Sequence, residues 1–258
     1  MVSAQIIEAV AALIDQAERI LFITGAGISA DSGLPTYRGV GGLYQDQATA
    51  EGYSIEEALS GLMFSWRPDI TWKYLWQIGA ACHGARFNRA HEVIALLQQR
   101  KPETVVLTQN IDGLHRAAGT TRLIEVHGHA FDLYCIRCQA EFSAAELIAN
   151  YEIKPELPPR CSNCGGLIRP AVVLFGERLP ENAVRGLIEV SLMNLDLVIA
   201  IGTSSSFPYI IRPVIEASQR GIPTVEINPA ETTISDIVTY RLPLRAAEAM
   251  EKIWGLIG

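Results

Sequence analysis

The sequence is poor in several features that mark particular classes of protein. It has only five cysteines in 258 residues, an odd and low count that argues against the disulfide framework of a secreted protein. Charged residues make up 19% of the chain and the formal net charge is −7, so the surplus of lysine and arginine that generic nucleic-acid binding needs is missing. No apolar run reaches the roughly 18 residues of a membrane-spanning helix.

The N-terminus also lacks a recognisable targeting signal. Glu8, Asp15 and Glu18 occur within the first stretch of the chain, and no basic start precedes an apolar block. What the chain does have is a hydrophobic fraction of 49%, too high for a disordered protein, and enough length to bury a large core. We therefore expect a soluble, cytoplasmic protein without direct nucleic-acid or membrane partners.

Short apolar runs alternate with segments of helical spacing along most of the chain. Residues 4–18 have apolar positions at helical spacing, and the run 19–24 that follows resembles a buried strand of a parallel sheet. Strands that alternate with helices predict an α/β fold with a Rossmann-like, doubly wound parallel sheet. The other expected strands are 104–108, 171–175, 196–203 and 223–228, and the other expected helices are 91–99, 181–192, 208–219 and 246–257.

Two stretches interrupt this alternation. One is rich in glycine and has no clear buried strand, and the other contains two pairs of cysteines and a proline-rich linker. We predict that both are insertions that together form a smaller module. The expected division is 1–35, 88–129 and 169–258 for the Rossmann domain, 36–87 for a loop and the helical part of the small module, and 130–168 for its cysteine-bearing part.

Four of the five cysteines form two C-x-x-C pairs. Two such pairs can place four thiolates around a tetrahedral Zn²⁺, and a closed site of four sulfurs is structural because it leaves no coordination position open. The alternative is redox or disulfide chemistry. Cys82, which follows two alanines, is expected to be a small buried residue. The expected zinc ligands are Cys135, Cys138, Cys161 and Cys164.

A glycine-rich turn follows the first expected strand. Residues 25–30 (G-A-G-I-S-A) approximate the G-x-G-x-x-G/A pattern, in which glycines let the backbone approach a pyrophosphate at a helix N-terminus. A plain tight turn is the alternative. A dehydrogenase would place an acidic residue at the end of a second strand about 20 residues later. That region has no expected strand here, so ordinary hydride transfer fits poorly.

Polar residues also follow the other expected strands. Ligands in open α/β sheets bind outside the carboxyl ends of the strands, and T-Q-N-I-D-G-L-H occupies such a position at 108–115. Asp112 could instead cap a following helix, but capping does not explain Gln109 and Asn110. The hydroxyl-rich stretch 202–206 and Asn228 could contact phosphate or ribose, or could be ordinary loop residues.

Histidine 127 in the stretch E-V-H-G suits a general base, because imidazole titrates near neutrality. A structural role is the alternative for any single histidine. The structural role is the one that we expect for His83, His91, His115 and His129.

These motifs, in this order, resemble those of the sirtuin family, and the resemblance covers most of the chain. Sirtuins are NAD⁺-dependent protein lysine deacylases, so it implies a Rossmann domain that binds NAD⁺ and a small module that holds one structural Zn²⁺. It also implies acyl-lysine proteins as substrates, and we expect a monomer. The matching stretches are 25–39, 108–115, 125–128, both C-x-x-C pairs, 173–177 (V-L-F-G-E), 202–205 and 227–229.

The resemblance also implies roles for individual residues. His127 would be the general base, and Asn110 and Asp112 would share in catalysis, Asp112 by holding the nicotinamide carboxamide. The residues implied in cofactor binding are Gly25, Ala26, Gly27, Ser29, Tyr37, Arg38, Gln109, Asn110, Ile111, Asp112, Gly202, Thr203, Ser204, Asn228 and Ala246.

A second set of residues would meet the acylated substrate. The stretch G-G-L-Y at 41–44 resembles the branch of the family that includes desuccinylases, which holds an acidic acyl group with a Tyr and an Arg three residues apart. Leu75 and Ile78 stand at those positions here. Burying a carboxylate without a cationic partner is costly, so we expect neutral acyl groups, acetyl or longer, to be preferred to succinyl. The alternative is that 72–78 is only a core helix. The substrate backbone would pair, by strand addition, with Val173, Leu174, Phe175, Gly176 and Glu177.

The implied reaction consumes NAD⁺ and transfers no hydride, in agreement with the partial dehydrogenase pattern. The amide oxygen of acyl-lysine attacks C1′ of the ribose and His127 takes a proton from a ribose hydroxyl, so that the products are nicotinamide, lysine and an O-acyl-ADP-ribose. A protein mono-ADP-ribosyltransferase that uses the same cleavage of NAD⁺ is the alternative. A non-catalytic NAD⁺-binding module and an oxidoreductase fit less well.

Overall fold

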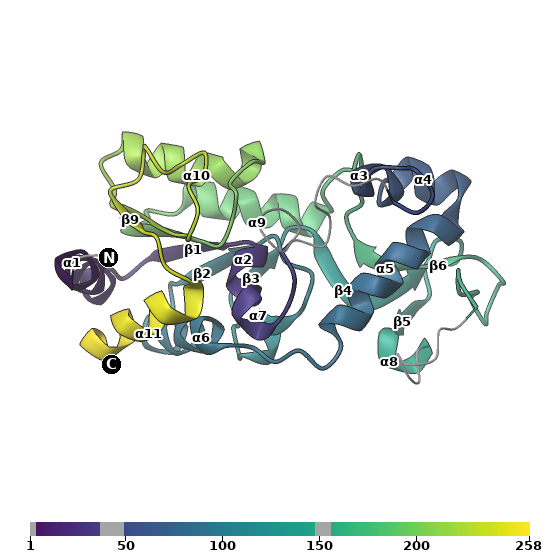
Figure 1. Ribbon diagram of the computed structural model, residues 1–258, viewed down its shortest axis with the longest axis horizontal. Coiled ribbons are helices and arrows are strands. Elements are labelled where there is room, and N and C mark those ends of the chain that lie inside the picture. Colours follow the sequence, from purple (N-terminus) through teal and green to yellow (C-terminus); the bar gives the residue numbers. More distant parts are fainter. Residues whose placement is uncertain (1–3, 37–48, 148–155) are drawn as a thin grey trace.

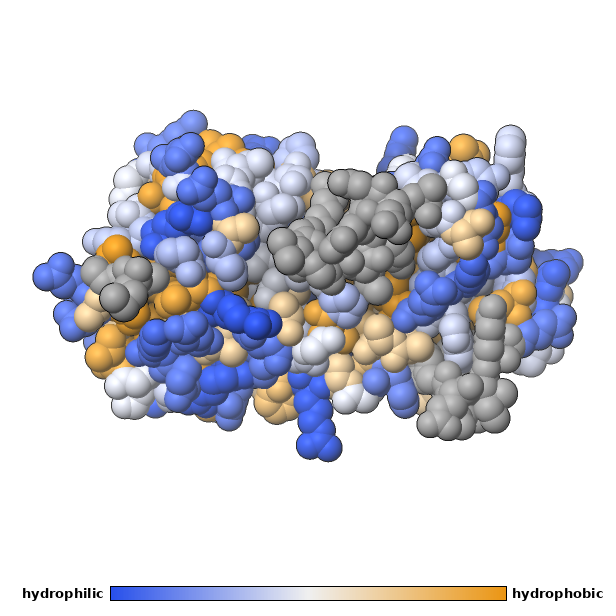
Figure 2. All heavy atoms as spheres, viewed as in Figure 1, coloured by the Kyte–Doolittle hydropathy of each residue, from blue (hydrophilic) through white to orange (hydrophobic). Residues whose placement is uncertain are grey.

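The structure, a computed structural model, describes residues 4–36, 49–147 and 156–258. An α/β lobe built on a large sheet carries α1 (Ala4–Gln16) and α11 (Ala246–Ile257), and a smaller lobe lies at the opposite end of the long axis (Figure 1). Hydrophilic side chains are spread over both lobes in the view of Figure 2, with apolar side chains interspersed among them. No helix among the described residues is long and apolar enough to cross a membrane.

The large sheet has six parallel strands in the order β3-β2-β1-β7-β8-β9. The apolar runs of β1, β2, β7 and β8 are buried along their whole length, as expected for strands covered on both faces. The order reverses between β1 and β7, and in open α/β sheets ligands bind at the carboxyl edge beside such a reversal. The strands are β1 (Ile20–Thr24), β2 (Val105–Thr108), β3 (Leu123–Glu125), β7 (Leu197–Ile201), β8 (Thr224–Ile227) and β9 (Tyr240–Leu242).

Helices cover both faces of this sheet, which confirms the expected doubly wound α/β architecture. One face packs against α1 (Ala4–Gln16), α6 (Arg89–Arg100) and α11 (Ala246–Ile257). The other packs against α9 (Glu181–Leu192) and α10 (Pro208–Gln219). All five of these helices were expected from the spacing of their apolar residues. Two short helices follow strands at the carboxyl edge, α2 (Ala26–Ser29), continued by a 3₁₀ turn over Ala30–Ser32, and α7 (Leu114–Ala117).

The smaller lobe combines both predicted insertions around one core. Its antiparallel sheet has the order β5-β4-β6, with β4 (Gly128–Cys135), β5 (Glu141–Ser143) and β6 (Ile168–Val172). The helices α3 (Ile55–Ala58), α4 (Gly61–Trp66), α5 (Pro68–Cys82) and α8 (Ala144–Leu147) complete it. The Trp72 indole N–H donates to the carbonyl of Ile168 over 2.8 Å, which ties α5 to β6.

One expected strand is wrong. Residues 171–175 were expected to extend the large parallel sheet, but the strand is Ile168–Val172 and pairs antiparallel with β4. An apolar run has the same appearance in either sheet, and only its partner distinguishes them. The expected boundary at residue 169 consequently falls inside β6. The short strands β3 and β9, at the two edges of the large sheet, were not expected.

Candidate active site

Glycines bring the loops after β1 and β7 into direct contact at the carboxyl edge. The N–H of Gly25 donates to the carbonyl of Ile201, and the N–H of Gly27 donates to that of Gly202 over 2.8 Å. A Cβ atom on Gly27 would lie 2.6 Å from the Cα of Gly202, and Gly202 itself has φ +60°. The turn therefore requires glycine at these positions, whatever it binds.

A hydrogen-bonded network joins this turn to the polar stretch after β2. The Ser29 hydroxyl donates to the Asp112 carboxylate over 2.7 Å. The side-chain amide of Asn110 donates to Ser29 Oγ and to the carbonyl of Gly25. Asp112 also accepts the N–H of Leu114, the first residue of α7, although the N-cap of that helix is Gly113. A contact with the start of the helix therefore accounts for one of its two hydrogen bonds.

The loops after β7 and β8 extend the same edge. Gln109 donates to the Thr203 hydroxyl over 2.7 Å, and Asn228 donates to the Thr203 carbonyl over 3.1 Å. Ser204 is exposed, whereas Ser205 is buried with φ +54° and its hydroxyl has no partner among the described residues. Such a backbone conformation is uncommon outside glycine and occurs often at ligand sites. Ser205 lies in the hydroxyl-rich stretch noted in the sequence, but it was not among the residues that the resemblance implies in cofactor binding.

Histidine 127 lies between the two sheets, after β3 and before β4. Its Nδ1 is 3.0 Å from the carbonyl oxygen of Gln109, and its Nε2 is 2.7 Å from the hydroxyl of Tyr209. Burial lowers the pKa of the imidazole, and the hydrogen bond to Gln109 opposes this in part. The ring is therefore neutral at pH 7 and able to accept a proton. Nothing in the sequence indicated Tyr209.

The remaining predicted cofactor residues are not part of the hydrogen-bonded network described above. Ala246 begins α11 and its side chain is buried in the core beneath the sheet. Ile111 packs at the edge of the small lobe's core. Tyr37 and Arg38, like residues 41–44, lie outside the described residues. Their roles stay predictions.

The predicted substrate segment 173–177 runs between the two lobes. The N–H of Val173 donates to the carbonyl of His127, and Phe175 exchanges hydrogen bonds with Leu59 and Gly61. The N–H of Leu174 donates to the carboxylate of Glu177. These three N–H groups are thus satisfied within the described part of the chain, so a peptide strand added here would have to use other groups of the segment.

A buried ion pair holds that segment in place. Arg169 on β6 makes two hydrogen bonds to the Glu177 carboxylate, of 2.7 and 2.9 Å, and also donates to the carbonyl of Val172. Its guanidinium lies over the rings of Phe64 and Tyr134. The buried cation is therefore fully engaged.

Leu75 and Ile78 both lie on α5 and are buried in the core of the small lobe. That core also contains Leu174 of the predicted substrate segment, with Ile111 packed at its edge. The structure therefore places the two residues in the same core as Leu174. Their packing agrees with the core-helix alternative, and an acyl-binding role stays a prediction.

The four paired cysteines come together at the far side of the small lobe. All four Sγ atoms lie within 4.8 Å of one another, with 3.5 Å between Cys135 and Cys164 and 3.6 Å between Cys138 and Cys161. Sulfurs around a tetrahedral Zn²⁺ with Zn–S bonds of about 2.3 Å lie about 3.8 Å apart. The set therefore fits Zn²⁺. The remaining thiol, Cys82, is half-buried and not fully buried as expected; burial raises its pKa to about 12, so little of it is thiolate at neutral pH.

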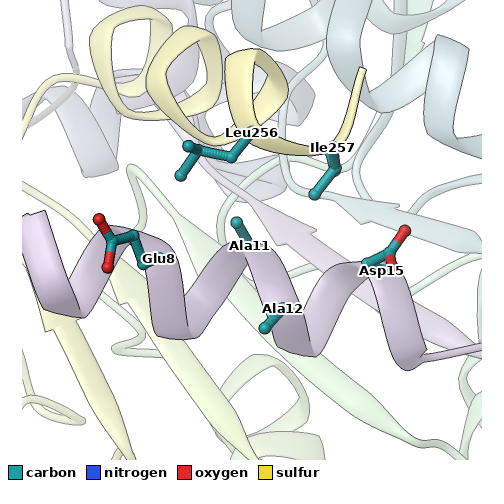
Figure 3. A pocket seen from close by; sticks show the side chains of 6 residues that line it. All are labelled: Glu8, Ala11, Ala12, Asp15, Leu256 and Ile257. Atoms are coloured by element: carbon teal, nitrogen blue, oxygen red, sulfur yellow. The ribbon is translucent and has the colours of Figure 1, made fainter.

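A surface pocket of about 400 Å³ lies elsewhere, between α1 and α11. In Figure 3 the methyl groups of Ala11 and Ala12 and the ends of Leu256 and Ile257 line it, with Glu8 and Asp15 at its two ends. None of these residues belongs to the loops at the carboxyl edge. The pocket is separate from the network described above.

Comparison with known proteins finds a matching family model and several similar proteins. The Sir2 family model matches residues 25–207. A protein named NAD-dependent protein deacylase 2 from Pseudomonas aeruginosa is 50% identical over 249 residues, covering 96% of this chain and 95% of the relative. An NAD-dependent protein deacylase from Aquifex aeolicus is 35% identical over 240 residues, covering 91% and 93%.

Solved structures agree. A Sir2 variant with a deacetylated p53 peptide and 3′-O-acetyl ADP-ribose matches with a TM-score of 0.85 at 29% identity, covering 96% of this chain and 97% of that one. A Sir2 homologue variant in complex with ADP-ribose matches with a TM-score of 0.82 at 33% identity, covering 97% and 96%.

Proposed function

The chain belongs to the Sir2 family, and from this premise we propose that it is an NAD⁺-dependent protein deacylase that removes acyl groups from lysine side chains. The observation that carries this proposal is the hydrogen-bonded network of Ser29, Asn110 and Asp112, with His127 bound through Nδ1 to the carbonyl of Gln109, the residue before Asn110. These residues come from three loops that are far apart in the sequence. The reaction consumes NAD⁺ and yields nicotinamide, the free lysine and an O-acyl-ADP-ribose.

The chain's own groups suit the binding of NAD⁺. The hydroxyls and amides at the ends of β1, β2, β7 and β8 are the donors and acceptors that diphosphate and ribose require. When bound, NAD⁺ supplies a ribose carbon that exchanges nicotinamide for the acyl oxygen. Ser29 and Asn110 hold the Asp112 carboxylate in one orientation, which suits it to accept hydrogen bonds from an amide such as that of nicotinamide.

The base of the reaction is His127. Its neutral, partly buried imidazole takes the proton of a ribose hydroxyl, so that this oxygen can attack the carbon of the acyl group. General base catalysis of this kind contributes about 10²–10⁴-fold to the rate. Because the proton transfer follows the loss of nicotinamide, the cleavage of NAD⁺ does not itself depend on this base.

The acyl groups favoured by the site are neutral, acetyl or longer. Support comes from the apolar packing of Leu75 and Ile78 on α5. Arg169, a buried cation of the same lobe, is already neutralised by Glu177 and cannot pair with a succinyl carboxylate at no cost.

A panel of acetyl-, succinyl- and long-chain-acyl lysine peptides, each incubated with NAD⁺, tests both statements. We expect one nicotinamide and one O-acyl-ADP-ribose per lysine freed, with the succinyl peptide slowest, and His127→Ala should lose at least a hundredfold in rate while it melts as the parent does. Faster desuccinylation contradicts the acyl preference alone. Label from NAD⁺ that ends on protein rather than on the acyl group identifies ADP-ribosyl transfer instead.

A further inference from the structure

The tautomer of His127 follows from its two hydrogen-bond partners. A backbone carbonyl only accepts hydrogen bonds, so Nδ1, 3.0 Å from the oxygen of Gln109, carries the ring proton. In the neutral ring Nε2 is then the atom with the free lone pair. That atom alone can act as the base.

The lone pair on Nε2 is already taken in this structure. The hydroxyl of Tyr209 lies 2.7 Å away, and with Nδ1 protonated the phenol must be the donor. A nitrogen with one lone pair cannot accept from Tyr209 and take a proton from a second hydroxyl in the same position. Any substrate hydroxyl that gives its proton to His127 must therefore take the place of Tyr209.

The start of α10 sets the position of the phenol. Tyr209 is the second residue of that helix, and its ring stacks on Phe207 with centroids 5.5 Å apart and 17° between the planes. Both rings meet His127 edge-on, at 5.6 and 6.0 Å. Within the described part of the chain the phenol makes no hydrogen bond besides the one to His127, so the hydroxyl can leave Nε2 while the ring stays stacked on Phe207.

We propose that Tyr209 is a positioning residue that holds His127 in its base-competent tautomer in the unliganded enzyme and yields Nε2 to the ribose hydroxyl when the cofactor binds. The second half of this statement rests on the proposed function, which supplies the ribose. The first half depends only on the contact between the two side chains.

The charged groups on the surrounding elements are engaged with other partners. Glu125, at the end of β3, is paired with Arg116. Asp112, after β2, accepts from Ser29 and from the backbone of Leu114. On β4, Asp132 lies 3.3 Å from His129. Tyr209 is thus the titratable group that hydrogen-bonds to His127, and burial raises the pKa of its phenol, so it remains a donor through the neutral range.

The test is the titration of His127 in Tyr209→Phe, which keeps the ring and its stack on Phe207 and removes only the hydroxyl. A donor to Nε2 stabilises the neutral imidazole, so its removal should raise the pKa of His127. Ring signals of isotope-labelled histidine, assigned by their loss in His127→Ala, report this directly. Tyr240→Phe on β9, which removes a hydroxyl on the opposite edge of the sheet, is the matched control and should leave the pKa as it is.

A second titration, with saturating ADP-ribose, tests the exchange. Wild type and Tyr209→Phe should then titrate alike, because the terminal ribose has replaced the phenol in both. The acidic limb of kcat/KM, which reports the free enzyme, should move to higher pH in the variant.

Each other result overturns the proposal. Equal His127 titrations in the free proteins would show that the contact does not exist in solution. A difference that persists with ADP-ribose bound would show that Tyr209 stays on the base and passes protons through it. Turnover of acyl peptides by the wild type tests the proposed function separately, since the free-protein titration needs no substrate.

Discussion

Next to the proposed site, a few buried residues form a second layer of contacts. The sequence did not indicate that these residues contact one another. The Thr24 hydroxyl donates to that of Thr108 over 2.8 Å and lies 2.9 Å from Nε2 of His115. The ring of His115 meets His91 edge-on, with centroids 4.8 Å apart. His91 Nδ1 accepts the N–H of Asn88, which caps α6. Both histidines thus support the loops after β1 and β2 from below.

This layer predicts that the protein loses stability in mild acid. Burial lowers the pKa of His91 from 6.5 to about 4 and keeps that of His115 well below its ordinary value. The unfolded chain therefore binds more protons than the native one between about pH 6.5 and pH 4. Stability should fall as the pH falls through that range, and His91 alone accounts for roughly 3 kcal/mol by pH 4.

Denaturant melts of the wild type and of His91→Gln, taken from pH 7 to pH 4, measure this effect. The variant removes the titrating group, so its stability should depend less steeply on pH. Leu192→Gln, at the exposed C-terminal end of α9, removes no titrating group; it is the control and should keep the full slope. Identical slopes in all three proteins would contradict the assignment to His91.

At the residue scale, the sequence indicated which groups would gather but not how they would be connected. Glycine, asparagine and aspartate after buried strands indicate a ligand edge, because parallel strands end at one side of the sheet. Tyr209 gave no such signal, since it is 82 residues from His127 in the sequence and lies at the start of an ordinary amphipathic helix. The histidines expected to be structural, His91 and His115, are buried and pack together.

At the scale of elements, one ion pair fixes the segment that follows β6, which is the predicted substrate segment 173–177. The side chain of Arg169 is 8% exposed and that of Glu177 29%. A Cβ on Gly61 would meet the Glu177 side chain at 2.8 Å, so α4 begins directly against this pair. The pair therefore joins β6, the predicted substrate segment and α4.

Removing one partner of this pair should be costly. Glu177→Ala leaves the Arg169 charge buried without its counter-ion, which we expect to destabilise the protein by about 3 kcal/mol, the lower end for such pairs because Glu177 is partly exposed. The KM for acyl peptide should rise more than the KM for NAD⁺, because Glu177 belongs to the predicted substrate segment 173–177. Urea melts and two-substrate kinetics measure these effects.

The matched control is the exposed pair Arg212–Glu216 on α10, where the side chains are 73% and 39% exposed. Glu216→Ala should cost less than about 1 kcal/mol, because water screens such pairs. If Glu177→Ala and Glu216→Ala lowered the free energy of unfolding by similar amounts, the pair of Arg169 and Glu177 would be screened by water like an exposed pair.

Helices and strands could be predicted where the pattern of apolar residues extends over many residues. The five long helices of the α/β lobe and the central strands have continuous patterns, whereas β3 and β9 have three residues each and lie at sheet edges. Three residues cannot establish a period. The error at β6 has a different cause, since pairing between strands far apart in the sequence is a tertiary property.

At the scale of the whole molecule, the two lobes depend on one another at His127. Its carbonyl accepts the N–H of Val173, its side chain contacts Gln109 and Tyr209 of the α/β lobe, and the next residue begins β4 of the small sheet. Further along β4, Cys135 is one of the four clustered thiols. The strand thus runs from the proposed base to the proposed metal site.

Loss of zinc should therefore abolish deacylation from a distance, by unfolding the small lobe. Structural zinc contributes folding free energy directly, and without it Cys135 and Cys161 would be buried thiols with no ligand. We expect Cys135→Ala, or treatment with a strong chelator, to remove one calorimetric transition while the transition of the α/β lobe remains. Activity should be lost with the first transition, and added Zn²⁺ should restore both in the chelated wild type.

Cys82→Ala, which removes a thiol outside the cluster, is the control and should keep metal and activity. An active, fully cooperative protein without metal would show that the four thiols do not hold the small lobe together, and that β4 positions His127 without zinc.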